Sequence, residues 1–294
     1  MEYVTSAIVA LREAEASFTG APLGRWMLEY ADLPFYAAFL YVGMVFGGQA
    51  WMKDRAAFNL KPLFIVWNLI LATFSIYGAS VSVPYLFDHL TTRGFRFTVC
   101  HSSFEWWANG PVGLWMAVFG LSKIPELMDT VFLVFQKKPV IFLHWYHHTT
   151  VMLYCWHAYL HGVAPGLWFA SMNFFVHSIM YGYYFMMNLS NVTRKIVKPL
   201  AQTITTLQLL QMVVGMTAIV AAFYYLDNHP DSCAIDRANS RMGLIMYTSY
   251  FILFASLFKK LYLTPKPKGA KGKKADDDSI CNAATAAMEK SKSS

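Results

Sequence analysis

Seven long apolar segments constrain the fold of this 294-residue chain more than any other feature of its sequence. A bilayer core of about 30 Å requires roughly 20 consecutive apolar residues per helix. Segments of that length lie at about 33–52, 62–83, 113–136, 139–160, 165–187, 199–226 and 241–263. With 56% hydrophobic and 14% charged residues, the composition excludes an ordinary soluble domain. We therefore predict an all-α, polytopic membrane protein in which residues 31–265 form one domain of about seven transmembrane helices.

The two termini differ from this membrane domain in composition. Residues 1–30 lack a basic start followed by a long apolar core, so we expect no cleaved signal peptide, and Val4, Ile8 and Leu11 indicate a short amphipathic helix. Residues 266–294 are too polar to build a core and are predicted to form a disordered tail. The tail ends in Lys-Ser-Lys-Ser-Ser, which resembles the dilysine retrieval signal of endoplasmic reticulum membrane proteins.

Most lysines and arginines fall on one side of this predicted topology. By the positive-inside rule that side faces the cytosol. We therefore predict a cytosolic C-terminus and, because the number of helices is odd, a lumenal N-terminus. The formal net charge of +7 is explained by topology and gives no indication of nucleic-acid binding.

Two cysteines, Cys100 and Cys233, fall in loops that this topology places in the oxidising lumen. We predict a disulfide between them, which would tie the connection between the second and third helices to that between the sixth and seventh. Two free thiols remain the alternative.

Charged residues interrupt the third apolar segment at regular spacing. Lys123, Glu126 and Asp129 follow one another at three-residue steps, which places them along one side of a helix. Each would cost about 2.5 to 3.5 kcal/mol at the bilayer centre, so this side must face the protein interior. An internal ion pair between Lys123 and Glu126 is an equally open reading, and it leaves Asp129 in need of another partner.

Polar groups on three further segments reach the same depth as Asp129 when depth is counted by the helical rise of about 1.5 Å per residue. Any one of them alone is explained by an interhelical hydrogen bond. Their coincidence on four helices favours a reaction chamber open to the cytosol. The residues are His144, His147, His148, Asn173, His177, Gln208 and Gln211.

The three histidines have the i, i+3, i+4 spacing that places imidazoles side by side on a helix, which is also a metal-binding arrangement. A second pair, His157 and His161, lies about 15 Å further along the same helix, too far to join one cluster. Without a metal, an imidazole with an ordinary pKa of about 6.5 is largely neutral at pH 7 and can accept an acyl group from a thioester. The carboxylate of Asp129 is a candidate to fix the tautomer of such an imidazole.

Four ordered motifs resemble the signature motifs of very-long-chain fatty acid elongases. They are Lys123-Ile-Pro-Glu-Leu-Met-Asp-Thr, His144-Trp-Tyr-His-His, Asn173-Phe-Phe-Val-His-Ser-Ile-Met-Tyr and Thr205-Thr-Leu-Gln-Leu-Leu-Gln. The resemblance covers residues 30 to 265 and implies an acyltransferase of the endoplasmic reticulum membrane, a 3-ketoacyl-CoA synthase. Such an enzyme condenses acyl-CoA with malonyl-CoA, releasing carbon dioxide and CoA, and needs no cofactor or bound metal. It also implies as partners the ketoacyl-CoA reductase, dehydratase and enoyl reductase of the elongation cycle, with a homodimer possible.

The resemblance assigns the nucleophile to His147, and we assign the other roles from the depth and position of the residues around it. His147 would take the acyl chain as an acyl-imidazole, supported by His144, His148 and Asp129, while Asn173 and His177 would stabilise the oxyanions. The residues assigned to substrate binding are Lys123, Glu126, Tyr181, Gln208, Gln211, Lys195, Lys198 and Lys260, the last three together with Lys137 and Lys138 as partners of CoA phosphates.

An apolar tunnel toward the lumen would hold the acyl tail, with its depth setting chain length. Bulky residues expected along it are Tyr154, Trp156, Phe169 and Phe223. Trp145 and Tyr146 within the histidine box resemble the elongases of saturated and monounsaturated chains.

Two other functions remain as alternatives. The box resembles those of diiron membrane desaturases and hydroxylases, although that class has three separated histidine sets and this chain has one HxxHH. A seven-span receptor or transporter would explain the internal charges but gives no reason for the clustered histidines.

Overall fold

The computed structural model describes residues 2–230 and 233–264, and in this part of the chain the regular structure is helical apart from one bridge between Thr19 and Asn109. The predicted tail, with its dilysine motif, lies outside the described residues. The helices are α1 Glu2–Ser17, α2 Gly20–Glu29, α3 Leu33–Met52, α4 Lys61–Cys100, α5 Ser103–Trp106, α6 Gly110–Ser122, α7 Met128–Phe135, α8 Phe142–Leu160, α9 Gly166–Leu189, α10 Asn191–Val197, α11 Ala201–Asn228 and α12 Arg237–Phe258.

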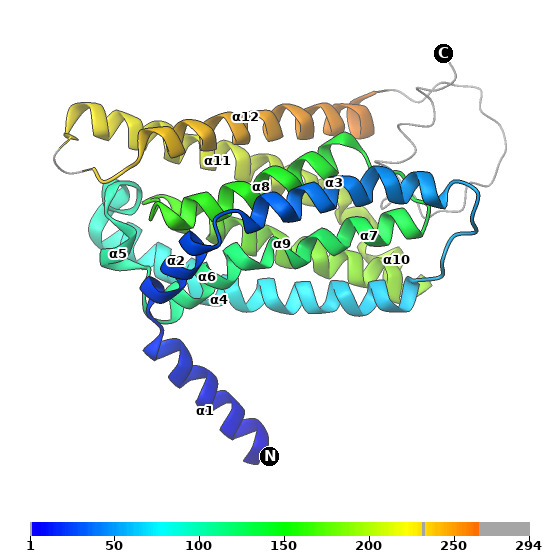
Figure 1. Ribbon diagram of the computed structural model, residues 1–294, viewed down its shortest axis with the longest axis horizontal. Coiled ribbons are helices and arrows are strands. Elements are labelled where there is room, and N and C mark those ends of the chain that lie inside the picture. Colours follow the sequence, from blue (N-terminus) through cyan, green and yellow to red (C-terminus); the bar gives the residue numbers. More distant parts are fainter. Residues whose placement is uncertain (1, 231–232, 265–294) are drawn as a thin grey trace.

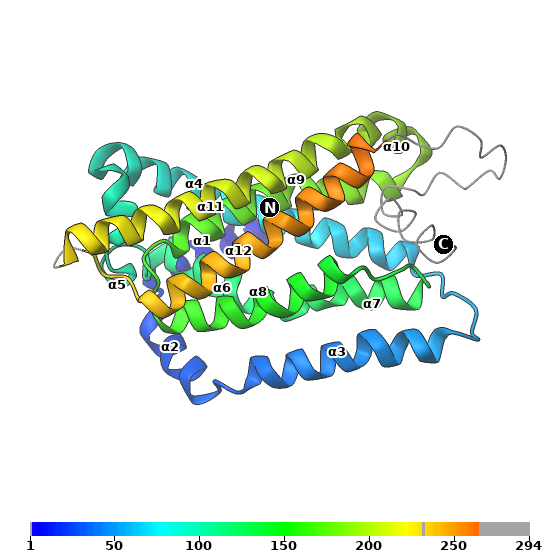
Figure 2. The same ribbon diagram turned by 90° about the horizontal axis from the view of Figure 1, so that it is seen from above.

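The long helices run side by side in a bundle, and α1 points away from it (Figure 1). Helix α4 packs along α9, and α11 packs along α12. Helix α3 lies at one edge, where it contacts α7 and α8 (Figure 2). The bundle therefore brings α4, α7, α8, α9, α11 and α12 around a common interior, with the predicted site residues on four of them.

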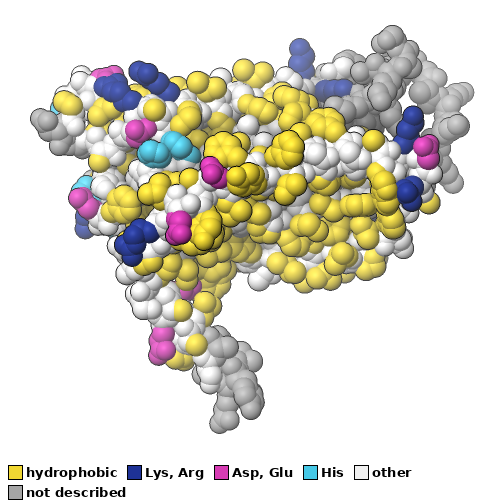
Figure 3. Space-filling model, in the orientation of Figure 1, with side chains coloured by type: hydrophobic (Ala, Val, Ile, Leu, Met, Phe, Trp, Pro, Cys, Tyr) yellow, Lys and Arg dark blue, Asp and Glu magenta, His cyan; other side chains and the backbone are white. Residues whose placement is uncertain are grey.

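The surface and the helix lengths fit a membrane-spanning protein. Hydrophobic side chains cover the middle of the face in Figure 3, and lysines and arginines gather at its two ends. Among the described residues, four helical segments are long and apolar enough to cross a bilayer: Leu33–Met52, Lys61–Cys100, Asn191–Asn228 and Arg237–Leu263. The all-α, multi-pass prediction is thus confirmed. The count of seven spans stays a prediction, because α8 and α9 carry the polar site residues and α6 and α7 are short.

The third apolar segment is broken where the sequence carries Pro125. Helix α6 ends at Ser122, a 3-10 turn covers Pro125–Leu127, and α7 begins at Met128. Proline lacks the backbone donor that a continuous helix needs at this position. Glu126 lies in the 3-10 turn and Asp129 in the first turn of α7.

Helix α4 is longer than the apolar segment that marks it. It continues past residue 83 to Cys100, with a kink at Gly94, whose φ of 82° favours glycine. Most of the expected loop between the second and third segments is therefore helical.

Cys100 and Cys233 are joined in a disulfide. It connects the end of α4 to the residues that precede α12, and Ala234 N donates a hydrogen bond to Cys100 O at 2.8 Å. The alternative of two free thiols does not hold in this structure, and Cys155 is the one free cysteine among the described residues.

Removing this disulfide should destabilise the fold. The bond spans 133 residues, so its loss frees a long loop in the unfolded chain, and we expect Cys100→Ala to lower the free energy of unfolding by about 2 to 4 kcal/mol. Unfolding titrations of the oxidised protein measure this. Cys233→Ala should cost the same and the double variant no more, whereas additive losses would contradict the pairing.

Candidate functional site

The histidine box opens into a cavity of about 340 Å³ inside the bundle. The cavity, called the chamber below, is lined by polar groups from α7, α8, α9 and α11, the four elements on which the sequence analysis placed them. These residues are Asp129, His144, His147, His148, Asn173, His177, Tyr181, Gln208 and Gln211. Tyr262 and Leu261, just after α12, complete the wall at the end near Pro139.

The three imidazoles of α8 lie against one another. The ring centroids of His144 and His148 are 4.5 Å apart, and those of His147 and His148 are 5.5 Å apart. His144 Nε2 is 2.8 Å from Thr130 Oγ1, which is 2.7 Å from the hydroxyl of Tyr41 on α3. This hydrogen-bonded chain fixes the orientation of the first histidine.

His147 has a different environment. Its ring packs on Tyr250, with centroids 4.9 Å apart, and the Tyr250 hydroxyl is 2.6 Å from Thr150 Oγ1. Across residues 2–230 and 233–264, no side chain hydrogen-bonds the ring nitrogens of His147. The ring is therefore held by packing while its nitrogens remain available to a molecule in the chamber.

The expected contact between Asp129 and an imidazole is wrong. Trp67 Nε1 donates to Asp129 Oδ1 at 2.6 Å, and the Tyr181 hydroxyl donates to Oδ2 at 2.9 Å. The carboxylate therefore faces α4 and α9. Asp129 thus holds the chamber wall together, and Thr130 is the residue of α7 that reaches His144.

Lys123 and Glu126 form the internal ion pair that the sequence left open. Lys123 Nζ lies 2.7 and 3.0 Å from the two carboxylate oxygens of Glu126, and Ser122 Oγ donates to Oε1 at 2.7 Å. Their side chains are only 3% and 7% exposed, and neither residue lines the chamber. The pair therefore lies behind residues that line the chamber, and its assignment to substrate binding stays a prediction.

This ion pair touches the chamber through Asn173. Lys123 Nζ lies 3.4 Å from Asn173 Oδ1. An amide whose oxygen faces an ammonium keeps its NH₂ group for another acceptor. Asn173 consequently presents a donor rather than an acceptor to the interior.

The remaining polar residues of the wall come from α9 and α11. The ring of His177 lies 5.5 Å from that of Tyr181, centroid to centroid. Gln208 Nε2 donates to Met180 Sδ at 3.3 Å, and Gln211 lines the chamber. All these predicted residues therefore border or support one interior space.

The lysines predicted to bind CoA differ in exposure and in the contacts that they make. Lys195 and Lys260 are exposed, and Lys198 is half-buried and makes contacts of its own. Lys137 Nζ donates to the carbonyls of Lys53 and Arg55, both at 2.9 Å, so it caps the connection after α3. None of these lysines lines the chamber itself.

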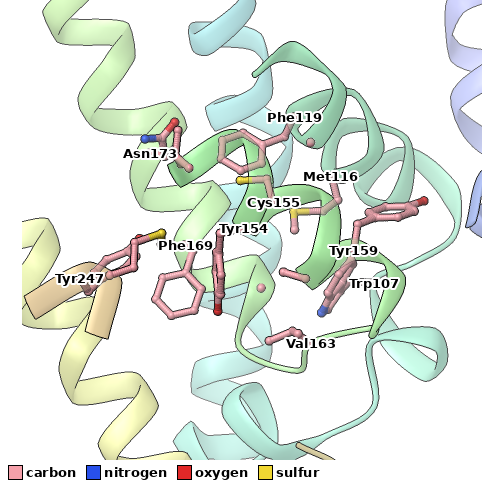
Figure 4. A pocket seen from close by; sticks show the side chains of 15 residues that line it. Trp107, Met116, Phe119, Tyr154, Cys155, Tyr159, Val163, Phe169, Asn173 and Tyr247 are labelled. Atoms are coloured by element: carbon pink, nitrogen blue, oxygen red, sulfur yellow. The ribbon is translucent and has the colours of Figure 1, made fainter. Parts of the chain in front are cut away.

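A second, apolar cavity of about 70 Å³ lies beyond Asn173, which borders both cavities. Figure 4 shows Trp107 and Tyr159 on one side of it and Phe169 and Tyr247 on the other. Tyr154 and Phe169 line it as expected of a tunnel.

Trp156 and Phe223, also expected along the tunnel, line neither cavity. Trp156 faces α2, where its Nε1 donates to Met27 O at 3.1 Å, and Phe223 packs against the cluster of α11 and α12 side chains around Ile219. The sequence therefore indicated only part of the tunnel: α8, α9 and α12 line the apolar cavity as expected, but no residue of α11 does, and Met116 and Phe119 of α6 line it instead.

No group of three or more His, Cys, Asp or Glu residues in the described chain is arranged to hold a metal ion. The second histidine pair stacks with its ring centroids 4.1 Å apart, and His157 Nδ1 lies 2.7 Å from Asn239 Nδ2. This pair belongs to the packing between α8 and α12.

Four residues of the site were missed in the sequence: Tyr41, Thr130, Trp67 and Tyr250. Each lies in an apolar segment where a single aromatic or hydroxyl side chain is unremarkable. Thr130 follows Asp129 directly, and that adjacency is the one signal that points to it.

Comparison with known proteins identifies the chain's relatives. The family model described as ELO, the GNS1/SUR4 family, matches residues 26–270. Fatty acid elongase 3 of Trypanosoma brucei brucei is 43% identical over 279 residues, covering 86% of this chain and 91% of that protein. Very long chain fatty acid elongase 4 of Trypanosoma cruzi is 46% identical over 272 residues, covering 92% and 94%. Very long chain fatty acid elongase 6 of Mus musculus is 39% identical over 261 residues, covering 88% and 95%.

These matches extend over the helices that build the chamber and include all four motifs. The protein therefore belongs to the ELO family, the GNS1/SUR4 family.

Proposed function

We propose that this membrane protein is the condensing enzyme of fatty acid elongation, a 3-ketoacyl-CoA synthase that joins an acyl-CoA to malonyl-CoA. The observation that carries the proposal is the unpartnered imidazole of His147 in a chamber that adjoins an apolar cavity. Its similarity to fatty acid elongases over most of the chain supports the same reaction.

The first half-reaction moves the acyl group to the protein. A ring nitrogen of His147 attacks the thioester carbonyl, the C–S bond breaks, and CoA leaves as the thiol after taking a proton. An acyl-imidazole remains, and it is reactive because its leaving group is a good one. Storing the acyl group in this way lets one CoA site serve both substrates in turn.

The second half-reaction forms the carbon–carbon bond. The bond from the malonyl α-carbon to its carboxylate breaks, carbon dioxide leaves, and the electron pair stays on the α-carbon. That carbon attacks the acyl carbonyl, the C–N bond to His147 breaks, and the departing ring nitrogen takes a proton from water. The products are 3-ketoacyl-CoA and the free imidazole.

Negative charge develops on carbonyl oxygens in both steps. The NH₂ group of Asn173 and the ring of His177 are the donors available in the chamber for these oxygens. The Lys123–Glu126 pair keeps the Asn173 amide in the donating orientation. His144, oriented through Thr130, and His148 pack beside the nucleophile and hold its ring in place.

The two ends of the substrate require different surroundings. Exposed Lys195 and Lys260 near the Pro139 end are suited to the phosphates of CoA, and the apolar cavity is suited to the acyl tail. With the lysine-rich end in the cytosol, as the positive-inside rule requires, CoA esters enter from the cytosolic side of the endoplasmic reticulum. Trp145 and Tyr146 in the box support saturated and monounsaturated substrates.

The experiment that tests this function is a reconstituted condensation assay. Full-length protein in detergent micelles is incubated with palmitoyl-CoA and malonyl-CoA, and the CoA esters are resolved by mass spectrometry. We expect 3-ketoacyl-CoA extended by two carbons, with one carbon dioxide released per product. Absence of product with every acyl-CoA tried, or an oxygenated or desaturated product instead, would contradict the proposal.

A further inference from the structure

Tyr247 lies between the two cavities. It lines the apolar cavity and packs in one buried cluster with Met212, and both Met212 and the preceding Gln211 line the chamber. Asn173 borders both spaces. The wall that separates the cavities at this point is therefore made of single side chains rather than of backbone.

The ring of Tyr247 is held by close neighbours. It packs on Phe169 with the ring centroids 4.8 Å apart and is only 6% exposed. On α11, a Cβ at Gly215 would lie 2.4 Å from Tyr247 Cε1, a distance that real Cβ atoms do not reach. Glycine at position 215 thus provides the space in which the ring rests.

The apolar cavity adjoins the chamber at Asn173 and is a space that an acyl chain attached to His147 can enter. To reach it, the tail must pass the wall made by Tyr247, Gln211 and Asn173. A side chain can turn aside by a rotamer change, whereas backbone cannot move so readily. Tails that fit within the chamber do not require this movement, and longer tails do.

Resting on the proposed function, we propose that Tyr247 is the gate between the chamber and the apolar cavity and determines which acyl chain lengths are elongated. Gly215 is the positioning residue behind it. Adding a methyl group at Gly215 displaces the ring toward the cavity and narrows the passage. Shortening Tyr247 opens the passage permanently.

The test compares selectivity between long and short acyl chains in the full-length protein. For each variant, kcat/KM is measured with malonyl-CoA and saturated acyl-CoAs from medium to very long chain. A missing or added methylene in an apolar pocket changes selectivity by about tenfold or more. We therefore expect Gly215→Ala to lower the long-to-short ratio of kcat/KM, and Tyr247→Leu to raise it, each by about tenfold.

Matched controls separate the gate from a general loss of folding. Gly43→Ala makes the same change on α3 where a Cβ meets nothing within 4 Å, and Tyr224→Leu removes a tyrosine that is 62% exposed on α11. Both should leave the ratio unchanged. The double variant Gly215→Ala/Tyr247→Leu should behave as Tyr247→Leu alone, because the ring that the methyl group displaces is gone.

The outcomes distinguish the gate from the function. If Tyr247→Leu and the wild type elongate short chains equally and show the same ratio, the gate is contradicted while the condensing activity stands. The comparison of Tyr247→Leu with the wild type tests the gate even if Gly215→Ala does not fold. If the wild type forms no 3-ketoacyl-CoA from any chain length, the proposed function fails, and a gate for acyl tails fails with it.

Discussion

Replacing His147 with alanine should reduce formation of 3-ketoacyl-CoA by a factor on the order of 10³ or more, because loss of a covalent nucleophile leaves only positioning and oxyanion stabilisation. Among the three box histidines, His144 is engaged by Thr130, whereas no side chain of the described residues hydrogen-bonds the ring nitrogens of His147 or His148. Of these two, His148 is buried and His147 is the more accessible. Initial rates at saturating acyl-CoA and malonyl-CoA measure the effect.

The control for this variant lies on the same helix. His161→Ala removes an exposed imidazole at the far end of α8 and should leave the rate within about twofold, since surface changes away from a site are nearly neutral. If His147→Ala keeps more than a tenth of the wild-type rate while His144→Ala or His177→Ala abolishes it, the nucleophile has been assigned to the wrong imidazole.

Replacing Lys123 with methionine should lower the free energy of unfolding by about 3 to 5 kcal/mol, because it leaves the buried Glu126 carboxylate without a counter-charge. Glu126→Gln should be comparably destabilising, since it leaves the ammonium unpaired. Denaturant titrations of the protein in mixed micelles measure both losses. An exposed lysine gives the control: Lys195→Met should change stability by less than about 0.5 kcal/mol.

The double variant tests whether the two residues act as a pair. With Lys123→Met and Glu126→Gln combined, no charge remains to be compensated, so the loss should be smaller than the sum of the single losses. Strictly additive losses would contradict the ion pair. The double variant should therefore fold. It also loses the contact between Lys123 and Asn173, so it should form 3-ketoacyl-CoA more slowly than the wild type.

The sequence predicted the fold class and the depth of the site in the membrane, because the length of a membrane helix and its rise per residue are both fixed. Each apolar segment has a length set by the bilayer, and a helix rises by a constant amount per residue. Counting along the chain was therefore enough to bring His147, Asn173, His177 and Gln208 to one depth. The structure places all four around the chamber.

Contacts that depend on the rotation of a helix could not be predicted in this way. Asp129 lies at the predicted depth, but it meets Trp67 and Tyr181 instead of an imidazole. Likewise, Trp156 lies on the expected helix but on the face toward α2. An error of one or two residues in the rotation of a helix changes which neighbours a side chain is expected to meet. The depth of the side chain in the membrane and the composition of the segment stay the same.

The extent of α4 escaped the sequence for a different reason. Residues 84–100 are too polar to mark a membrane helix and begin with Pro84, which ordinarily signals a helix end. Packing decides their conformation: Leu86 belongs to the buried cluster around Phe174, and Cys100 is fixed by its disulfide.

The acyl-imidazole at His147 is tested most directly by the intact mass of the purified protein after incubation with acyl-CoA alone. We predict a mass increase equal to one acyl group, absent in His147→Ala and lost when malonyl-CoA is added, with 3-ketoacyl-CoA appearing as the adduct disappears. Formation of 3-ketoacyl-CoA by a protein that never carries the adduct, or an adduct that persists in His147→Ala, would contradict this account.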